Sequence, residues 1–411
     1  MSLADPSSAG AIASDEGGHR VWATRFAGRR WPLFKLVLGT GALTVLTLGI
    51  YRFWQKTRVR RWLWSAIRPG GYPLEYAGDP LEKLLGFLIA VVILAFYIGI
   101  VNLLLMFASF ALFQGNYAAY ALSLVGVFPI WFYARYRARR YILARTRWLG
   151  LRFGLEPGAW GFAIRALWHG FLALITAGLL WPRMTFKLEQ YRTNRTFFGE
   201  TRMHQDGRWT MLYGAMKWHF INLPIAFGGL ICIGANEALA LPILTLGAVL
   251  WLYAAVYYRV ETRIRLTNHK RAGALRLRLT ASPLRIFWIL ASGHTLALLV
   301  SALPTLILLG LFLELQSLET LVEMGLENTP PIFAGLNRTA LIALSVMAYF
   351  SIFLVWTACT QAWVTLPLIR HYAQGLEVIG TEAMATFGQR PRDDHPEAEG
   401  FAEALDVGAS L

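Results

Sequence analysis

Long uncharged stretches alternate along this chain with short basic ones. Because roughly 20 apolar residues cross the ~30 Å of a bilayer core as a helix, each long stretch predicts a membrane-embedded helix. The stretches that contain no Asp, Glu, Lys or Arg are 84–113, 117–134, 238–258, 286–313 and 339–369.

Three further apolar segments have interrupted patterns: 31–51, 160–181 and 219–235. The first contains three glycines, the second contains Arg165 and His169, and the third contains Pro224. We count them as embedded segments, which makes eight in all, of which six to eight cross. For 31–51 and 160–181, crossing the membrane and re-entering it both remain open.

A second pattern recurs after several apolar segments. An aromatic and Arg-rich stretch is followed by a short segment in which apolar and polar residues alternate, as in 275–279. Alternation with period two is typical of a half-buried strand. We therefore predict an internal repeat of up to five copies, in which each basic helix end leads into a strand and strands of different copies pair. The fold class predicted is an all-α polytopic membrane protein with about eight embedded helices and short cytoplasmic β-strands.

Composition narrows the class. The chain has 411 residues, of which 56% are hydrophobic and only 15% are charged, yet Lys and Arg exceed Asp and Glu by 39 to 24, a net charge of +15. Soluble domains are about 25% charged, and disordered chains are polar. A disordered chain and a soluble nucleic-acid-binding protein are therefore excluded. Two cysteines, Cys232 and Cys359, exclude a disulfide scaffold.

Most of the basic residues lie in four loops, 52–68, 135–152, 183–208 and 259–278, whereas the charged residues of 314–331 are all acidic. The positive-inside rule places the four basic loops in the cytoplasm. A single crossing by 160–181 conflicts with this, since it separates two basic loops. We expect a bacterial inner-membrane, multi-pass protein with both termini in the cytoplasm. The predicted division is a disordered tail at 1–30, one repeat-built membrane domain at 31–380 and an acidic disordered tail at 381–411.

The first copy of the repeat resembles a known family. Residues 43–51 read Leu-Thr-Val-Leu-Thr-Leu-Gly-Ile-Tyr and are followed by Trp54-Gln55-Lys56 and an Arg-rich run. This resembles the YjgN family of bacterial inner-membrane proteins. Gln55 stands where that family has a small residue, and Ala66-Ile67 stands where it has Asn-Thr. The resemblance implies a location and an architecture, and no activity, because the family has no established biochemical function.

Candidate chemistry is sparse. No pattern indicates a catalytic centre, a cofactor site or a metal site, and we expect the protein not to be an enzyme. Polar residues inside apolar segments are costly and are therefore candidates for function, although hydrogen bonding between helices is the simpler explanation for His294, Asn102 and Gln361. These candidates are Asn102, Arg165, His169, Asn222, His294 and Gln361. The candidate contacts to anionic lipid or ligand are Arg52, Lys56, Arg60, Arg135 and Arg139; anchoring of the topology is their simpler explanation.

Two hypotheses of function follow. The first is transport or handling of a small solute or lipid, because repeats and interrupted helices recur in transporters. The alternative is a membrane scaffold or regulatory protein that binds anionic lipid or a partner through its basic cytoplasmic face. The bilayer and its anionic headgroups are the expected partners, nucleic acid is not, and the sequence fixes no oligomeric state.

Overall fold

The structure is a computed structural model, and it describes residues 12–14, 18–113, 118–235, 237–323 and 338–390. The described chain divides into two compact units. One comprises the N-terminal residues up to Ala27, Trp64–Pro283 and the C-terminal residues from Tyr372. The other comprises Gly28–Leu63 and Leu284–His371.

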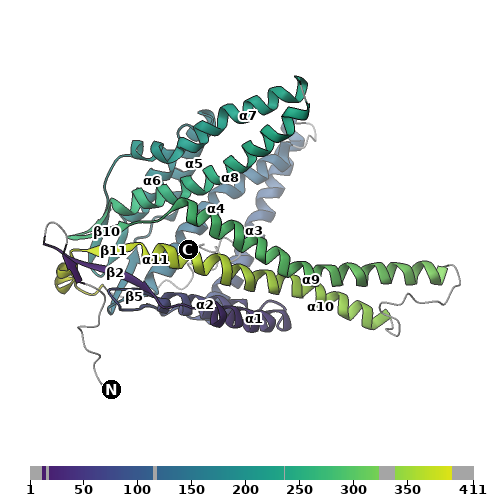
Figure 1. The fold of residues 1–411 in the computed structure, drawn as a ribbon, viewed down its shortest axis with the longest axis horizontal. Coiled ribbons are helices and arrows are strands. Elements are labelled where there is room, and N and C mark those ends of the chain that lie inside the picture. The colour runs from purple at the N-terminus through teal and green to yellow at the C-terminus, as the bar shows by residue number, and fades with distance from the viewer. Residues whose placement is uncertain (1–11, 15–17, 114–117, 236, 324–337, 391–411) are drawn as a thin grey trace, which may run out of the picture. The chain divides into compact units, whose positions relative to one another are not determined.

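Short strands of the first unit form one eleven-stranded antiparallel sheet (Figure 1). The strands are β1 (Ile12–Ser14), β2 (Arg20–Phe26), β3 (Ile67–Pro69), β4 (Leu74–Tyr76), β5 (Thr146–Trp148), β6 (Leu151–Leu155), β7 (Thr196–Phe198), β8 (Thr201–Gln205), β9 (Lys270–Ala272), β10 (Leu275–Leu279) and β11 (Leu376–Ile379).

The sheet nearly closes into a barrel. Hydrogen-bonded neighbours run from β4 through β5 to β11 in chain order, β11 pairs with β2, and β2 pairs with β3. The turn that joins β3 to β4 completes the ring. Trp148, Phe198 and Leu275 are buried in one core with Trp22 packed against them, so the alternating apolar residues face the interior. The predicted pairing of strands from different parts of the chain is confirmed.

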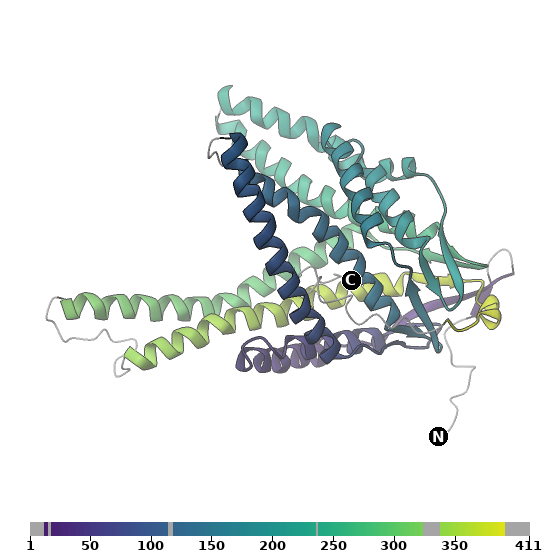
Figure 2. The ribbon, with the colours of Figure 1, turned by 180° about the vertical axis from the view of Figure 1, so that it is seen from behind.

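Helices run almost directly into these strands. In the first unit they are α3 (Pro80–Phe113), α4 (Ala118–Ala144), α5 (Ala159–Ile175), α6 (Trp181–Thr193), η2 (Trp209–Met216), α7 (Lys217–Ala235) and α8 (Glu237–Asn268). Helices α7 and α8 pack side by side, whereas α3 contacts α4 and then diverges from it, as Figures 1 and 2 show. The 3-10 helix η4 (Thr381–Thr386) follows β11.

Side chains at two helix ends fasten the helix to its strand pair. Asn194 Oδ1 accepts a 2.8 Å hydrogen bond from the backbone N–H of Gln205, the last residue of β8. Asn268 Oδ1 accepts a 2.6 Å hydrogen bond from the N–H of Leu279, the last residue of β10. The two bonds occupy equivalent places, so the end of each helix fixes where the outer strand stops.

The second unit is helical. It contains α1 (Arg30–Leu46), most of α2 (Arg52–Ala66), α9 (Pro283–Glu323), α10 (Arg338–Cys359), the π-helical segment η3 (Thr360–Thr365) and most of α11 (Leu366–Gln374). Helix α1 packs against α10 and η3. Leu33 and Val37 are buried on α1.

The predicted all-α class with about eight embedded helices is wrong. The sheet includes eleven strands. The sequence pattern gave them too little weight, because each strand is only three to seven residues long. Four helices of the described chain are long and apolar enough to cross a membrane, at Trp209–Ile233, Ala238–Asn268, Pro283–Leu313 and Arg338–Gln374. The uncertain segments 31–51 and 160–181 are not among them, because α1 and α5 have only 17 residues each.

Both predicted tails contain ordered structure. Residues 20–26 form β2, since Val21, Trp22 and Ala23 pair with β11. Residues 381–386 form η4, and Gly388 accepts a 3.0 Å hydrogen bond from the N–H of Glu200. The rest of the predicted acidic tail, 391–411, lies outside the described residues.

Candidate functional site

Charged side chains gather where the helices meet the barrel. Arg139 of α4, Glu189 of α6 and Arg263 of α8 each lie seven residues before the first residue of the strand that follows. This equal spacing brings the three residues near one another, close enough for their charges to interact. Arg60 of α2 has the same spacing in the sequence.

Glu189 is the centre of the group. Its side chain is buried, with a 7% exposed fraction for the residue. One carboxylate oxygen lies 2.5 Å from Lys270 Nζ of β9 and 3.8 Å from Arg139 Nη2. The other oxygen lies 2.5 Å from Arg192 Nη2, one turn further along α6. One carboxylate therefore joins cations from α4, α6 and β9.

The pKa directions in this group follow from burial and from the charges around Glu189. Burial alone raises the pKa of a carboxyl, yet Arg192, Lys270 and Arg139 together hold the pKa of Glu189 well below its ordinary value. Burial lowers the pKa of Lys270 despite its bond to Glu189, and burial lowers the pKa of Arg139 as well. Glu189 is therefore ionised in the folded protein, where its one carboxylate faces three cations.

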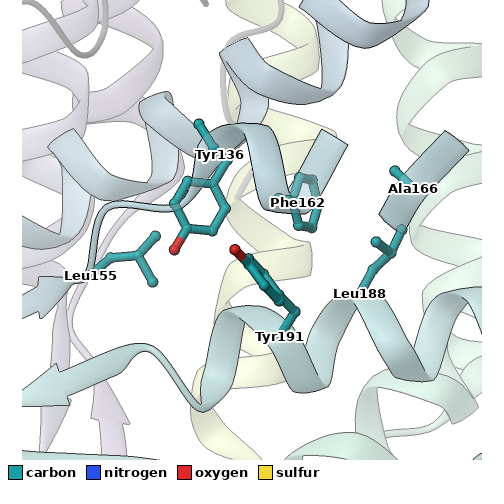
Figure 3. Close-up of a cluster of buried hydrophobic side chains, with 7 residues drawn as sticks. Tyr136, Leu155, Phe162, Ala166, Leu188 and Tyr191 are labelled. Carbon is teal, nitrogen blue, oxygen red and sulfur yellow. The ribbon is translucent and has the colours of Figure 1, made fainter. Parts of the chain in front are cut away.

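An aromatic cluster packs α4, α5 and α6 together next to these charges. Figure 3 shows Tyr136 and Tyr191 with their hydroxyl groups directed toward each other. The Tyr136 hydroxyl donates a 2.7 Å hydrogen bond to the carbonyl of Glu156, and the Tyr191 hydroxyl donates a 2.9 Å hydrogen bond to that of Gly158. Burial raises the pKa of Tyr136, so its hydroxyl stays protonated.

Two guanidinium groups contact the ring of Tyr191. The Arg195 carbon Cζ lies 3.8 Å from the ring centroid and that of Arg165 lies 4.6 Å from it. Arg165 also donates a 2.9 Å hydrogen bond to the carbonyl of Gly161. An ideal Cβ at Gly161 would lie 2.5 Å from the Tyr191 hydroxyl, so only glycine admits this approach.

His169 lies one turn after Arg165 on α5, on the same face. Its Nδ1 is buried and has no hydrogen-bond partner within the described part of the chain. Burial lowers the pKa of His169, and the positive charges of Arg183, Lys187 and Arg165 lower it further. The sequence prediction of Arg165 and His169 therefore leads to a local cluster of cations on α5 and α6.

A shallow groove lies on the outer face of the sheet. Its volume is about 410 Å³, and Thr201, Arg202, His204, Arg271 and Gly273 line it. Its arginines already have partners, because Arg202 pairs with Glu156 and Arg271 Nε lies 2.9 Å from Asp206 Oδ2.

The other predicted intramembrane polar residues do not join this cluster in the structure. Asn222 of α7 is buried, and its Oδ1 has no hydrogen-bond partner among the described residues. The Gln361 Oε1 is likewise buried and unpartnered there. His294 Nδ1 lies 2.7 Å from the carbonyl oxygen of Leu290 in its own helix. The side chain of Asn102 in α3 lies outside the described residues.

The predicted lipid-contact cations divide between two helices. Arg52, Lys56 and Arg60 lie on α2 at i, i+4 and i+8, as predicted. On α4, Arg135 Cζ lies 4.6 Å from the Trp131 ring centroid, and burial together with Arg192 lowers its pKa. Sequence reasoning treated Arg139 as a surface contact and missed its partner Glu189. The sequence did contain a signal for this pairing, because Arg139 and Glu189 lie the same number of residues before the strands that follow them.

Metal binding finds no support in the described residues, since no group of three or more His, Cys, Asp or Glu side chains lies close enough together to hold an ion. In comparison with known proteins, the profile of a family described as a bacterial protein of unknown function (DUF898) matches residues 22–321. No curated protein and no solved structure matches the chain.

Proposed function

The chain belongs to the DUF898 family of bacterial proteins of unknown function, which is the family of the YjgN proteins, and we propose that it is a membrane-embedded protein that binds anionic phospholipid headgroups. The site of binding is the α5–α6 pair. The carrying observation is the group of cations Arg165, Arg183 and Lys187 around His169, on a helix pair with an apolar outer face.

The outer face of α5 fits an acyl-chain environment. Trp160, Ile164, Trp168 and Phe171 are exposed on this helix, whereas Phe162, Ala163 and Ala166 are buried. An exposed apolar face of this extent is unusual for a soluble surface. Tryptophan rings favour the headgroup level of a bilayer, so Trp160 and Trp168 suit an interfacial position.

The polar groups of the pair fit a phosphate. A headgroup phosphate carries acceptor oxygens only, which match the donors of Arg165, Arg183 and Lys187. Burial and these three cations lower the pKa of His169, and an anion bound beside the cations offsets part of their charge.

The location proposed is the bacterial inner membrane, with several crossings and the sheet in the cytoplasm. Four helices long enough to cross support membrane embedding. The pairing of β2 with β11 supports a common side for the two ends of the chain, because both strands belong to one sheet. Within this proposal the predicted repeat accounts for the recurring order of helix, strand and strand.

Solute transport stays a hypothesis, because no arrangement of the described residues favours it over lipid binding. It requires polar side chains along one passage, and His294 is engaged with the backbone of its own helix. Binding of a lipid headgroup needs only the local cluster on α5 and α6.

The test compares lipid retention in native mass spectrometry of the purified protein with phosphatidylglycerol and phosphatidylcholine. We expect preferential retention of phosphatidylglycerol by the unaltered chain. At about 1 kcal/mol per cation near a charged headgroup, Arg183→Gln with Lys187→Gln weakens it roughly thirty-fold. The control, Arg271→Gln with Arg278→Gln, removes the same charge from the sheet and leaves the preference intact. Equal losses in both double variants, or no preference at all, contradict the proposal.

A further inference from the structure

Two helical hairpins, one in each unit, have the same turn. The turn between α1 and α2 covers residues 47–51, and the turn between α5 and α6 covers 176–180. Thr47 corresponds to Thr176, and Gly49 to Gly178. In each turn the glycine has a positive φ, 93° and 87°, and so has the residue before it, Leu48 at 51° and Ala177 at 48°.

The hydrogen bonds of the two turns agree one for one. The N–H groups of residues 47, 48, 49, 50 and 52 donate to the carbonyls of residues 43, 45, 44, 47 and 49. Those of residues 176, 177, 178, 179 and 181 donate to the carbonyls of 172, 174, 173, 176 and 178. The remaining N–H groups, of Tyr51 and Leu180, donate to the threonine hydroxyls at 3.0 Å and 3.2 Å.

Each threonine completes its turn. The Thr47 hydroxyl donates a 2.8 Å hydrogen bond to the carbonyl of Leu43, and the Thr176 hydroxyl donates one of the same length to that of Leu172. Every backbone N–H from 47 to 52 and from 176 to 181 therefore has a partner inside its own turn. Backbone within hydrocarbon must satisfy its polar groups without water, and these turns meet that condition for their donors.

The side chains at the tips are apolar and strongly exposed. Leu46 is 78% exposed and Leu48 is 92% exposed in the first hairpin; Leu174 is 79% exposed and Ile175 is 65% exposed in the second. A turn in water favours Asn, Asp or Gly at positive φ, because these residues tolerate that backbone conformation and are polar or small. Leucine at position 48 fits a turn that faces acyl chains.

Contacts within the second unit show how far the first tip extends. Phe34 lies beside Trp363, with ring centroids 5.3 Å apart, and Gly41 approaches Leu354, so α1 runs antiparallel to the helical segment that begins with α10. Leu48 lies seven residues beyond Gly41, about 10 Å at ~1.5 Å per residue. On α10, counted from Arg338, this level lies about halfway along the ~20 residues that cross the hydrocarbon.

Contacts within the first unit place the second tip inside the same boundary but nearer to it. Thr185 Oγ1 lies 3.0 Å from the hydroxyl of Tyr258, which immediately precedes Arg259, the first charge after the apolar part of α8. The tip continues past this level, away from Arg259. The Tyr213 hydroxyl donates a 2.9 Å hydrogen bond to the carbonyl of Leu179, and Tyr213 lies near the start of the candidate span Trp209–Ile233, before Lys217.

We propose that both hairpins are re-entrant: each tip enters the leaflet next to the basic helix ends, contacts acyl chains there, and returns to the side it came from. Lipid acyl chains surround the tips, because each hairpin packs on a helix that is long and apolar enough to cross a membrane. This arrangement places the basic residues of 52–68 and 183–208 on one side, which removes the conflict in the charge pattern. It does not depend on headgroup binding.

The test uses single cysteines at Leu48 and Leu179 in a Cys232→Ala, Cys359→Ala background, in vesicles. Each cysteine carries a bimane fluorophore, and the lipids carry bromine either near the headgroup or near the chain middle. We expect bromine in the lipid to quench both fluorophores, more strongly from the mid-chain position at Leu48→Cys, and no reaction of the free thiols with an impermeant maleimide from either side. Ala274→Cys, at the exposed turn between β9 and β10, is the control: it reacts from one side and is not quenched.

Two results overturn the proposal. Reaction of Leu48→Cys or Leu179→Cys from the side opposite to Ala274→Cys shows a crossing segment. Reaction from the same side without lipid quenching shows a tip outside the bilayer. Both substituted leucines are exposed in the structure, so the variants retain the packed core, and an unchanged melting temperature verifies this.

Discussion

Replacing Glu189 by Gln tests whether one carboxylate holds the helix–barrel junction together. The substitution keeps the size of the side chain and removes the negative charge shared by Arg139, Arg192 and Lys270. Breaking a buried ion pair by removing one partner costs about 3–5 kcal/mol, because the other charge is left uncompensated. We expect a loss of this size, seen as a fall of roughly 5–15 °C in melting temperature.

The assay is thermal unfolding of the detergent-solubilised protein followed by tryptophan fluorescence. Glu156→Gln is the matched control, since Glu156 pairs with Arg202 at the more exposed face of the sheet. Such a pair contributes about 0–1 kcal/mol. A double variant, Glu189→Gln with Lys270→Met, removes one of the uncompensated cations and should recover part of the loss. The reasoning is refuted if Glu189→Gln and Glu156→Gln lower the melting temperature equally.

The remaining predictions concern acid stability and two local contacts. The pKa of Glu189 is lower in the folded protein than its ordinary value of 4.5. The ion pairs of Glu189 therefore stabilise the fold above this pH, and the stabilisation is lost as pH falls through the folded-state pKa. Glu189→Gln should flatten the acid limb of a plot of melting temperature against pH. Gly161→Ala forces its Cβ against the Tyr191 hydroxyl and should destabilise by about 1–3 kcal/mol in thermal unfolding, whereas Gly170→Ala, with 3.9 Å to its nearest neighbour, should not. Asn268→Ala removes the acceptor of the Leu279 N–H and should speed hydrogen exchange at that amide alone; unchanged exchange there contradicts the assigned role.

The sequence alone determined features that depend on neighbouring residues. The alternation in 275–279 predicted a strand, and this segment is β10. The interrupted patterns of 31–51 and 160–181 indicated elements unlike ordinary spans, and both contain 17-residue helices ended by a glycine turn. These features follow from the periodicity of side chains and from backbone sterics within a few residues, so they can be recognised from the sequence alone.

Only the tertiary structure decided which distant segments meet. Closure of the barrel depends on β2 pairing with β11, although their paired residues Val21 and Ile379 are separated by most of the chain. Arg139 reads as one more surface cation until α6 brings Glu189 beside it. Local pattern fixes the face that a residue presents, whereas pairing of strands and compensation of buried charge depend on several elements at once. The positive balance of the sequence thus predicted a basic surface, and the fold made part of it a buried junction.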